Sequence, residues 1–455
     1  MRPLACNRNM RNRSLLVAFV LSLLTSAAFA APPPNWDEIL GPSQGKIPDP
    51  LPDVIWRTDL QKALAEAQQS NRPLFVTLRC LPCKQCSAFD KDVMEGGPLL
   101  APLLSQFITV RLTNAKAIDL RMLPIQGYQD LDISWWGYFV SPQGRIYAIF
   151  GGKDHVSDAT RISPEALAAT MKRVLAYHYD PRREKWDIDG PAPDLNAEPR
   201  SISTLPGYQI WSSRNGTELK KQECIHCHQV SEILRQPAID AGAFDKVRDT
   251  QIWPLPENVG VVLDRDDGLL VKSVQSSSPA ATAGIKSGDS LAFAGDRRLF
   301  GQADFRGILH RGPQGAGSIP VMWLRDGKIM SGNLNVSEGW RKTILDWRMS
   351  ISQGNISHGP AFFPLAMSKA ERQRFNIPDG AMGVKPFIYK DSVATKAGLR
   401  ASHMITAVNG QSPNVVGRSF EWWFRSTFNP GDEISLTVLE TPGKSTEIKF
   451  VLPKD

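Results

Sequence analysis

The residues with the most evident chemistry are cysteines, and five of the six in this 455-residue chain fall in two tight clusters. The first cluster holds Cys80, Cys83 and Cys86, and the C-x-x-C from Cys83 to Cys86 directly follows an expected buried strand over residues 74–78. Two thiols three residues apart at a helix start lie within disulfide range, and the helix dipole with Lys84 favours the thiolate of Cys83. We therefore predict Cys83 as the attacking sulfur, Cys86 as the resolving sulfur and Cys80 as an additional, exchanging thiol. A structural disulfide is the alternative, while a metal site lacks an evident fourth ligand.

The second cluster, Cys224-Ile225-His226-Cys227-His228, matches the C-x-x-C-H pattern to which c-type haem is attached. In that arrangement Cys224 and Cys227 form thioethers and His228 ligates the iron, so c-type haem is a candidate cofactor and His228 a candidate metal ligand. No distal ligand is evident, and Gln229 stands where a glycine is usual. A disulfide, or a second dithiol exchanging electrons with the first cluster, is the alternative. A zinc site from these cysteines and histidines would be cramped.

The first 30 residues have the composition of an export signal. Four arginines precede an apolar run over residues 15–24, and Ala28-Phe29-Ala30 is an A-x-A cleavage pattern. We predict a signal peptide over residues 1–30 and an exported, periplasmic or extracellular chain with no membrane span after cleavage; an uncleaved anchor is the alternative. The net charge of +7 falls to +3 without those arginines, so we expect no nucleic-acid partner.

The remaining composition, 42% hydrophobic and 22% charged, is that of a globular protein and excludes a largely disordered chain, a coiled coil or a multi-span membrane protein. The expected fold class is multidomain, α/β plus mainly β. The predicted parts are a proline-rich tether (31–52), an α/β domain (53–178), a linker (179–206), a small helical C-x-x-C-H segment (207–250) and two repeats (251–340 and 341–455).

The two repeats are visible as an internal duplication. The segment Ser278–Ile285 aligns without a gap with Ser392–Leu399, at an offset of 114 residues, and both end in Ala-Gly and an aliphatic residue. Each copy then enters an apolar stretch that ends in a turn. A period of this length indicates a duplicated domain and not a solenoid.

The α/β domain resembles the exported thioredoxin fold. The resemblance depends on the order of four features: a helix to Ser70, Pro73, a strand, and a C-x-x-C ten residues after that proline. The resemblance implies thiol–disulfide oxidoreductase chemistry at Cys83 and Cys86. The chain departs from it where a cis-proline usually faces the dithiol, because Ser134-Trp135-Trp136 stands there.

Residues 260–336 resemble the PDZ domains of bacterial periplasmic serine proteases, on Val259-Gly260-Val261, Ala283-Gly284-Ile285, Gly288-Asp289 and Leu324-Arg325-Asp326-Gly327. This implies binding of protein or peptide C-termini by strand addition, with the backbone amides of Val259, Gly260 and Val261 holding the terminal carboxylate. The second copy is expected to be degenerate, because Ser402-His403 replaces Gly288-Asp289. No G-x-S-x-G motif accompanies the repeats, so proteolysis is not implied.

The whole arrangement resembles bacterial exported thioredoxin-like/PDZ proteins, some of which carry selenocysteine at the redox motif. By that resemblance Cys83 or Cys86 stands where selenium sits in relatives. We expect an exported redox protein whose PDZ domains bind partners. The alternative is a non-catalytic extracytoplasmic PDZ scaffold in which both C-x-x-C pairs are structural.

Overall fold

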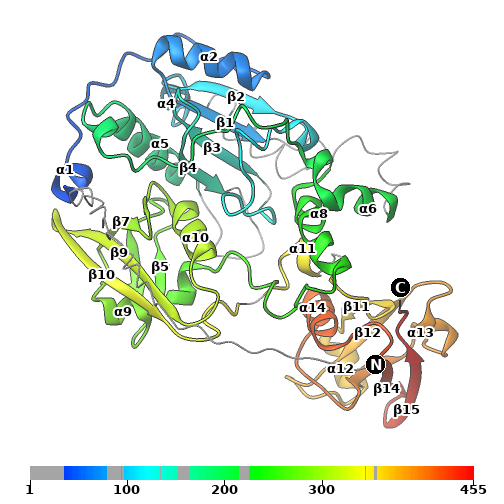
Figure 1. The fold of residues 1–455 in the computed structure, drawn as a ribbon. Coiled ribbons are helices and arrows are strands. Elements are labelled where there is room, and N and C mark those ends of the chain that lie inside the picture. Colours follow the sequence, from blue (N-terminus) through cyan, green and yellow to red (C-terminus); the bar gives the residue numbers. More distant parts are fainter. Residues whose placement is uncertain are drawn as a thin grey trace, which may run out of the picture. The chain divides into compact units, whose positions relative to one another are not determined.

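A four-stranded sheet organises the first part of the chain (Figure 1). The computed structural model describes residues 35–78, 94, 97–133, 135–151, 163–214, 225–343, 345–352 and 356–454. The sheet order is β2-β1-β3-β4, with β1 parallel to β2 and all other pairs antiparallel. The strands are β1 (Leu74–Leu78), β2 (Ile108–Leu112), β3 (Trp136–Val140) and β4 (Ile146–Gly151). All five β1 residues are buried, as expected for an apolar strand covered on both faces.

Helices begin where the sequence supplies caps. In α2 (Leu60–Ser70) the side chain of Asp59 accepts hydrogen bonds from the first-turn amides of Gln61 and Lys62, both at 3.1 Å. Asp59 therefore caps this helix. In α5 (Pro164–His178) Ser163 is the cap and proline opens the first turn. The remaining elements of the first half are short: α1 (Trp36–Leu40), α4 (Ala101–Leu104), η2 (Ala115–Ala117), η4 (Arg183–Lys185) and η5 (Ile202–Thr204).

Two further helices, α6 (Pro206–Arg214) and α8 (Cys227–Asp240), complete the core on one face of the first sheet. Their buried residues Trp211, Val230 and Ile233 belong to one hydrophobic cluster with β1 and β3. The segment predicted as a separate helical unit at 207–250 therefore shares its core with the α/β domain.

The first repeat contains a four-stranded sheet of order β10-β9-β7-β8 and a two-stranded β5-β6 ribbon. Its elements are η6 (Pro256–Val259), β5 (Val261–Leu263), β6 (Val271–Val274), α9 (Pro279–Ala283), β7 (Ser290–Ala294), β8 (Arg297–Arg298), α10 (Gln302–Arg311), β9 (Gly317–Arg325) and β10 (Lys328–Val336).

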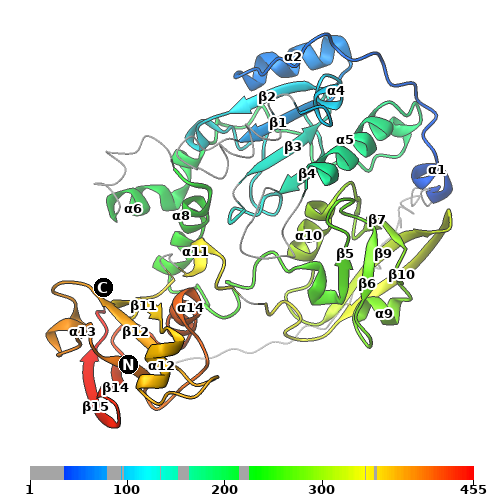
Figure 2. The ribbon, with the colours of Figure 1, turned by 180° about the vertical axis from the view of Figure 1, so that it is seen from behind.

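The second repeat contains a five-stranded antiparallel sheet of order β11 to β15 (Figure 2). Its strands are β11 (Phe362–Ala366), β12 (Val384–Ile388), β13 (Met404–Val408), β14 (Glu433–Thr441) and β15 (Lys444–Val451). Its helices are α12 (Lys369–Arg374), α13 (Val393–Lys396) and α14 (Gly417–Thr427), with α11 (Met349–Ser352) before them.

The duplication seen in the sequence has a structural counterpart. Ser278 caps α9 and Ser392 caps α13, each accepting a hydrogen bond from the third helical amide at 3.2 Å. In the turn that follows, Asp289 accepts from the Lys286 amide at 2.7 Å, and His403 Nδ1 accepts from the Arg400 amide at 3.3 Å. The histidine thus makes the turn contact that the aspartate makes in the first copy.

A buried ionic cluster joins the α/β domain to later parts of the chain. Arg348 donates to Asp130 Oδ1 at 2.7 Å and to Asp132 Oδ2 at 3.2 Å, and Arg306 of α10 also binds Asp130. The Asp130 carboxylate is 3% exposed and the Arg348 side chain is fully buried. Burial opposes ionisation of Asp130, but the charges of Arg348 and Arg306 outweigh it and lower the pKa of Asp130.

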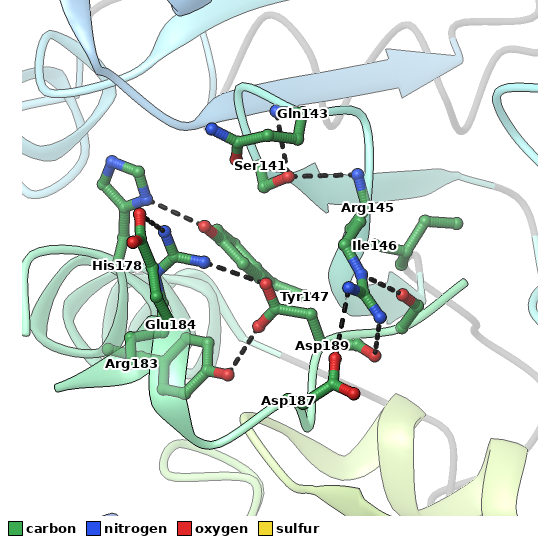
Figure 3. Close-up of polar contacts among 12 residues, drawn as sticks. Ser141, Gln143, Arg145, Ile146, Tyr147, His178, Arg183, Glu184, Asp187 and Asp189 are labelled. Atoms are coloured by element: carbon green, nitrogen blue, oxygen red, sulfur yellow. Dashed lines mark hydrogen bonds and ion pairs between the residues drawn. The ribbon is translucent and has the colours of Figure 1, made fainter. Parts of the chain in front are cut away.

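A second polar cluster gathers Tyr147, His178, Arg183 and Asp189 (Figure 3). Tyr147 of β4 contacts His178 Nδ1 at 2.9 Å, and His178 Nε2 lies 3.1 Å from the Asn71 carbonyl oxygen. Asp189 accepts from Arg183 at 2.8 Å. Both nitrogens of the buried histidine are therefore satisfied when the ring is neutral.

Residues 36–455 form one compact unit by their contacts. Among the described residues, every helix is too short or too polar to cross a bilayer. The predicted signal peptide and the first three prolines of the tether, Pro32, Pro33 and Pro34, lie outside the described residues.

Candidate redox site

The carboxyl end of β1 is the point from which the sequence leads into the first cysteine cluster. Cys80, Cys83 and Cys86 follow the last residue of the strand, Leu78, and lie outside the described residues. The neighbouring strand at this point is described, because Leu78 pairs with Trp136, the first residue of β3. Trp136 therefore marks the end of the sheet from which the C-x-x-C segment departs.

Cys227 of the second cluster lies at that same end of the sheet. Its Sγ accepts a hydrogen bond from Trp136 Nε1 at 2.9 Å. The Cys227 side chain is 9% exposed and belongs to the same hydrophobic cluster as Leu78 and Trp136. Cys227 is thus held beside the carboxyl end of β1, from which the sequence leads into the first cysteine motif. Cys224 lies outside the described residues.

Local sequence explains why Cys227 is held there. It is the first residue of α8, and the apolar side chains of Ile225, Val230 and Ile233 lie around it in the same core. Trp136 is 1% exposed, and a buried indole N–H is costly without an acceptor. The Cys227 sulfur supplies that acceptor.

Two groups near Cys227 direct positive partial charge at its sulfur. The first turn of the 14-residue helix α8 contributes its dipole, and the Trp136 N–H points at Sγ. Tyr138, also on β3, donates its hydroxyl proton to the Pro124 carbonyl oxygen at 2.9 Å. The pKa of Tyr138 is raised well above its ordinary value, mainly because the side chain is buried and secondly because of negative charge on Cys227. The Tyr138 side chain is consequently uncharged where it lines the site.

Two histidines flank Cys227. The rings of His226 and His228 stack with centroids 5.6 Å apart and an angle of 12° between their planes. His228 Nδ1 lies 3.7 Å from a carboxylate oxygen of Glu232, whose other oxygen accepts from Trp211 Nε1 at 3.1 Å. Burial, followed by the charge of His228, lowers the pKa of His226. Trp211 thus holds the Glu232 carboxylate next to His228.

A c-type haem would require Cys227 to present its sulfur to the edge of a porphyrin. In the described residues this sulfur faces the core of the sheet and is already in contact with Trp136 Nε1. That environment suits a packed thiol and does not fit a porphyrin edge. His228 remains the residue that would ligate the iron, and the haem itself stays a prediction of the sequence.

The predicted carboxylate-binding loop lies at the start of β5. Gly260 has φ +84°, and a Cβ there would lie 2.1 Å from the Ser278 side chain, so this position requires glycine. The Gly260 amide donates to the Glu257 carbonyl oxygen at 3.0 Å within the η6 turn. Val259 and Val261 are fully buried. Carboxylate binding through the Gly260 amide would therefore need that turn to open.

Sequence reasoning missed two features of this region. The sequence marks Trp136 only as a departure from the thioredoxin pattern, and its pairing with Leu78 and its contact with Cys227 are visible only in the structure. No sequence pattern indicates the buried cluster around Asp130, because its arginines come from distant segments of the chain. His178 is buried, His310 is partly buried, and both are hydrogen-bonded.

Comparison with known proteins supports part of this description. The sequence model of a family described as thioredoxin-like matches residues 55–123, the range that contains α2, β1, β2 and the first cysteine cluster. The chain is also similar, at 35% identity over 109 residues, to a protein named serine protease Do-like HtrA from Lactococcus lactis subsp. cremoris (strain MG1363). That alignment covers 23% of this chain and only about a quarter, 25%, of the relative. Residues 55–123 are therefore a thioredoxin-like domain, within a mixed α/β chain of several sheets.

Proposed function

We propose that this chain is an exported thiol–disulfide oxidoreductase whose reactive group is the Cys83/Cys86 dithiol. The observation that carries the proposal is the thioredoxin-like match over residues 55–123, which spans β1 and the C-x-x-C that follows it. A central, fully buried strand is a rigid support for a dithiol at its carboxyl end.

The chemistry is thiol–disulfide exchange with a disulfide of a partner protein. The Cys83 thiolate attacks one partner sulfur, which breaks the partner's disulfide and forms a mixed disulfide. Cys86 then attacks Cys83, which forms the Cys83–Cys86 bond and releases the partner as a dithiol. Two electrons pass to the partner, and its two sulfurs take up protons. The reverse sequence oxidises a partner dithiol.

We further propose that the two repeats are PDZ domains and that the first binds protein or peptide C-termini. The support is the similarity to the HtrA-type protein and the repeated helix caps at Ser278 and Ser392. Such binding would bring partners close to the dithiol. A PDZ scaffold with structural disulfides is the second candidate, and the absence of a proline before Trp136 favours it.

A redox titration separates these candidates. The full exported chain is equilibrated in glutathione buffers, and the oxidised fraction of Cys83/Cys86 is measured by alkylation and peptide mass spectrometry. We expect reversible titration, together with reduction of a disulfide-bonded peptide that stops in Cys83→Ser and persists in the control Cys80→Ser. If the pair stays oxidised across the whole glutathione range, only the scaffold candidate remains. An absorption spectrum of the same sample tests for haem.

A further inference from the structure

A cavity of about 260 Å³ lies between the loop that precedes β3, helix α8 and the segment that leads into the first repeat. Its walls come from residues 125–131, α8, residues 249–253, α10 and α11. Small-molecule pockets begin at about 300 Å³, so a cavity of this size is suited to one small ligand. The apolar part of its wall consists of Ile125, Leu131, Leu234, Ile252, Trp253 and Ile351.

Arg235 of α8 brings a positive charge into this wall. Its Nη1 donates to the Ser350 carbonyl oxygen at 2.6 Å. Among the residues that the structure describes, no carboxylate forms an ion pair with this guanidinium. Burial lowers the pKa of Arg235, and the charges of Asp132 and Glu232 oppose that change without contacting it. The guanidinium therefore has hydrogen-bond donors left for an anion inside the cavity.

Gln129 supplies a buried acceptor to the same cavity. The residue is 3% exposed, and its Oε1 has no hydrogen-bond partner among the described residues. A buried acceptor without a donor is costly, so a ligand that donates to Oε1 gains from meeting it. Asp249 also lines the cavity, but its carboxylate oxygens accept from Arg248 at 2.6 and 2.8 Å. The cavity thus brings together a cation and an unmet acceptor.

His310 of α10 adds a hydrogen-bond donor. Its Nδ1 accepts from the Trp253 amide at 3.3 Å and lies 3.4 Å from Nη2 of Arg341. Both neighbours can only donate, so the neutral ring carries its proton on Nε2. The ring stacks on the Trp253 indole, with centroids 4.7 Å apart. Trp253 has φ +51°, which is costly for a bulky residue, and Arg348 binds its carbonyl oxygen at 3.2 Å. This side of the cavity is therefore held in a fixed conformation.

We propose that the cavity binds one small aliphatic acid with a hydrogen-bond donor on its α carbon, the chemistry that branched-chain α-amino and α-hydroxy acids share. The carboxylate pairs with Arg235, and the Nε2–H of His310 is a second donor for it. The α-ammonium or α-hydroxyl group donates to Gln129 Oε1, and the branched chain lies against Leu234 and Ile252. This site contains none of the cysteines, so the proposal does not depend on the proposed redox function.

A ligand series on the full exported chain tests this chemistry by isothermal titration calorimetry. The probes are leucine, its α-hydroxy analogue leucic acid, leucinamide and isocaproate. We expect saturable binding of leucine or leucic acid, and the tighter of the two identifies the preferred donor. Leucinamide lacks the carboxylate and should bind at least about tenfold more weakly. Isocaproate lacks the α donor and should bind about fivefold more weakly. If neither acid shows saturable binding, or if leucinamide binds as well as leucine, the proposal is wrong.

Two further measurements place the binding in this cavity. Arg235→Gln should weaken binding of the preferred acid at least about tenfold. The control Arg182→Gln, at an arginine that pairs with Asp180, should change it less than about twofold. Photo-leucine on the wild-type chain covers the case in which Arg235→Gln does not fold, and we expect its label in residues 125–131 or 231–235. Label confined to residues 259–261 would assign the binding to the predicted carboxylate loop and overturn the proposal.

Discussion

Acid stability provides a quantitative test of the polar cluster around His178. The His178 ring is buried, its Nε2–H faces the Asn71 carbonyl oxygen, and its Nδ1 accepts from the Tyr147 hydroxyl. Protonating Nδ1 would bury a charge near Arg183 and would require the Tyr147 hydroxyl to turn from donor to acceptor. Burial is the main reason that the pKa of His178 falls from 6.5 to about 4; the Asn71 contact opposes the fall and Arg183 adds to it.

The sign and size of the effect follow from linkage. The unfolded chain takes up a proton near pH 6.5, and the folded chain does so only near pH 4. Stability from this residue is therefore fully present above pH 6.5 and is lost as the pH falls toward 4. At about 1.4 kcal/mol per pH unit, the loss between pH 7 and pH 4 is about 3 kcal/mol.

The assay compares urea unfolding of the wild-type chain with that of His178→Gln at several pH values. Glutamine can donate to Asn71 and accept from Tyr147 without titrating, so it isolates the protonation. We expect the variant to lose about 3 kcal/mol less than the wild type between pH 7 and pH 4. Other groups whose pKa is lowered, such as His310, contribute equally to both proteins. Identical pH dependence of the two would refute the burial argument.

Two further predictions concern the ionic cluster and the first repeat. Asp130→Asn leaves Arg306 and Arg348 buried without their main counter-charge. We therefore expect the free energy of unfolding in urea to fall by about 3–5 kcal/mol. The control Asp119→Asn, at a partly exposed carboxylate, should lower it by less than about 1 kcal/mol. Equal losses would contradict the importance of burial. Peptides with free C-termini should bind the full chain near Gly260 with modest affinity, measured by fluorescence anisotropy, and amidated peptides should not; binding that ignores amidation would exclude a carboxylate loop.

Much of the architecture could be predicted because it depends on local sequence. The strand at Leu74–Leu78 has only apolar residues and threonine between turn signals, and its predicted bounds match the structure. In the structure the helices after Ser163, Ser278 and Ser392 begin with serine caps, which act within one helical turn. Local rules of this kind need no knowledge of distant residues.

The contacts around Cys227 could not be predicted, because they join segments far apart in the chain. Its hydrogen bond to Trp136 spans 91 positions, and that between Arg348 and Asp130 spans 218. No periodicity or motif reports such a pairing. The C-x-x-C-H pattern is shared by haem sites and dithiols, and the burial of the Cys227 sulfur beside an indole N–H could not be read from it.

The shared core of the first sheet and α8 limits how this chain can be divided by recombination. A fragment ending in the linker at 179–206 would keep Trp136 and Tyr138 but would lose Cys227 and Val230, which cover them. Such a fragment would present a wide apolar surface to water and would be prone to aggregate. A descendant that inherited the thioredoxin-like segment alone would need a new cover for that face. The linker at 179–206 is therefore a poor site for recombination. We expect the two cysteine motifs to be inherited together.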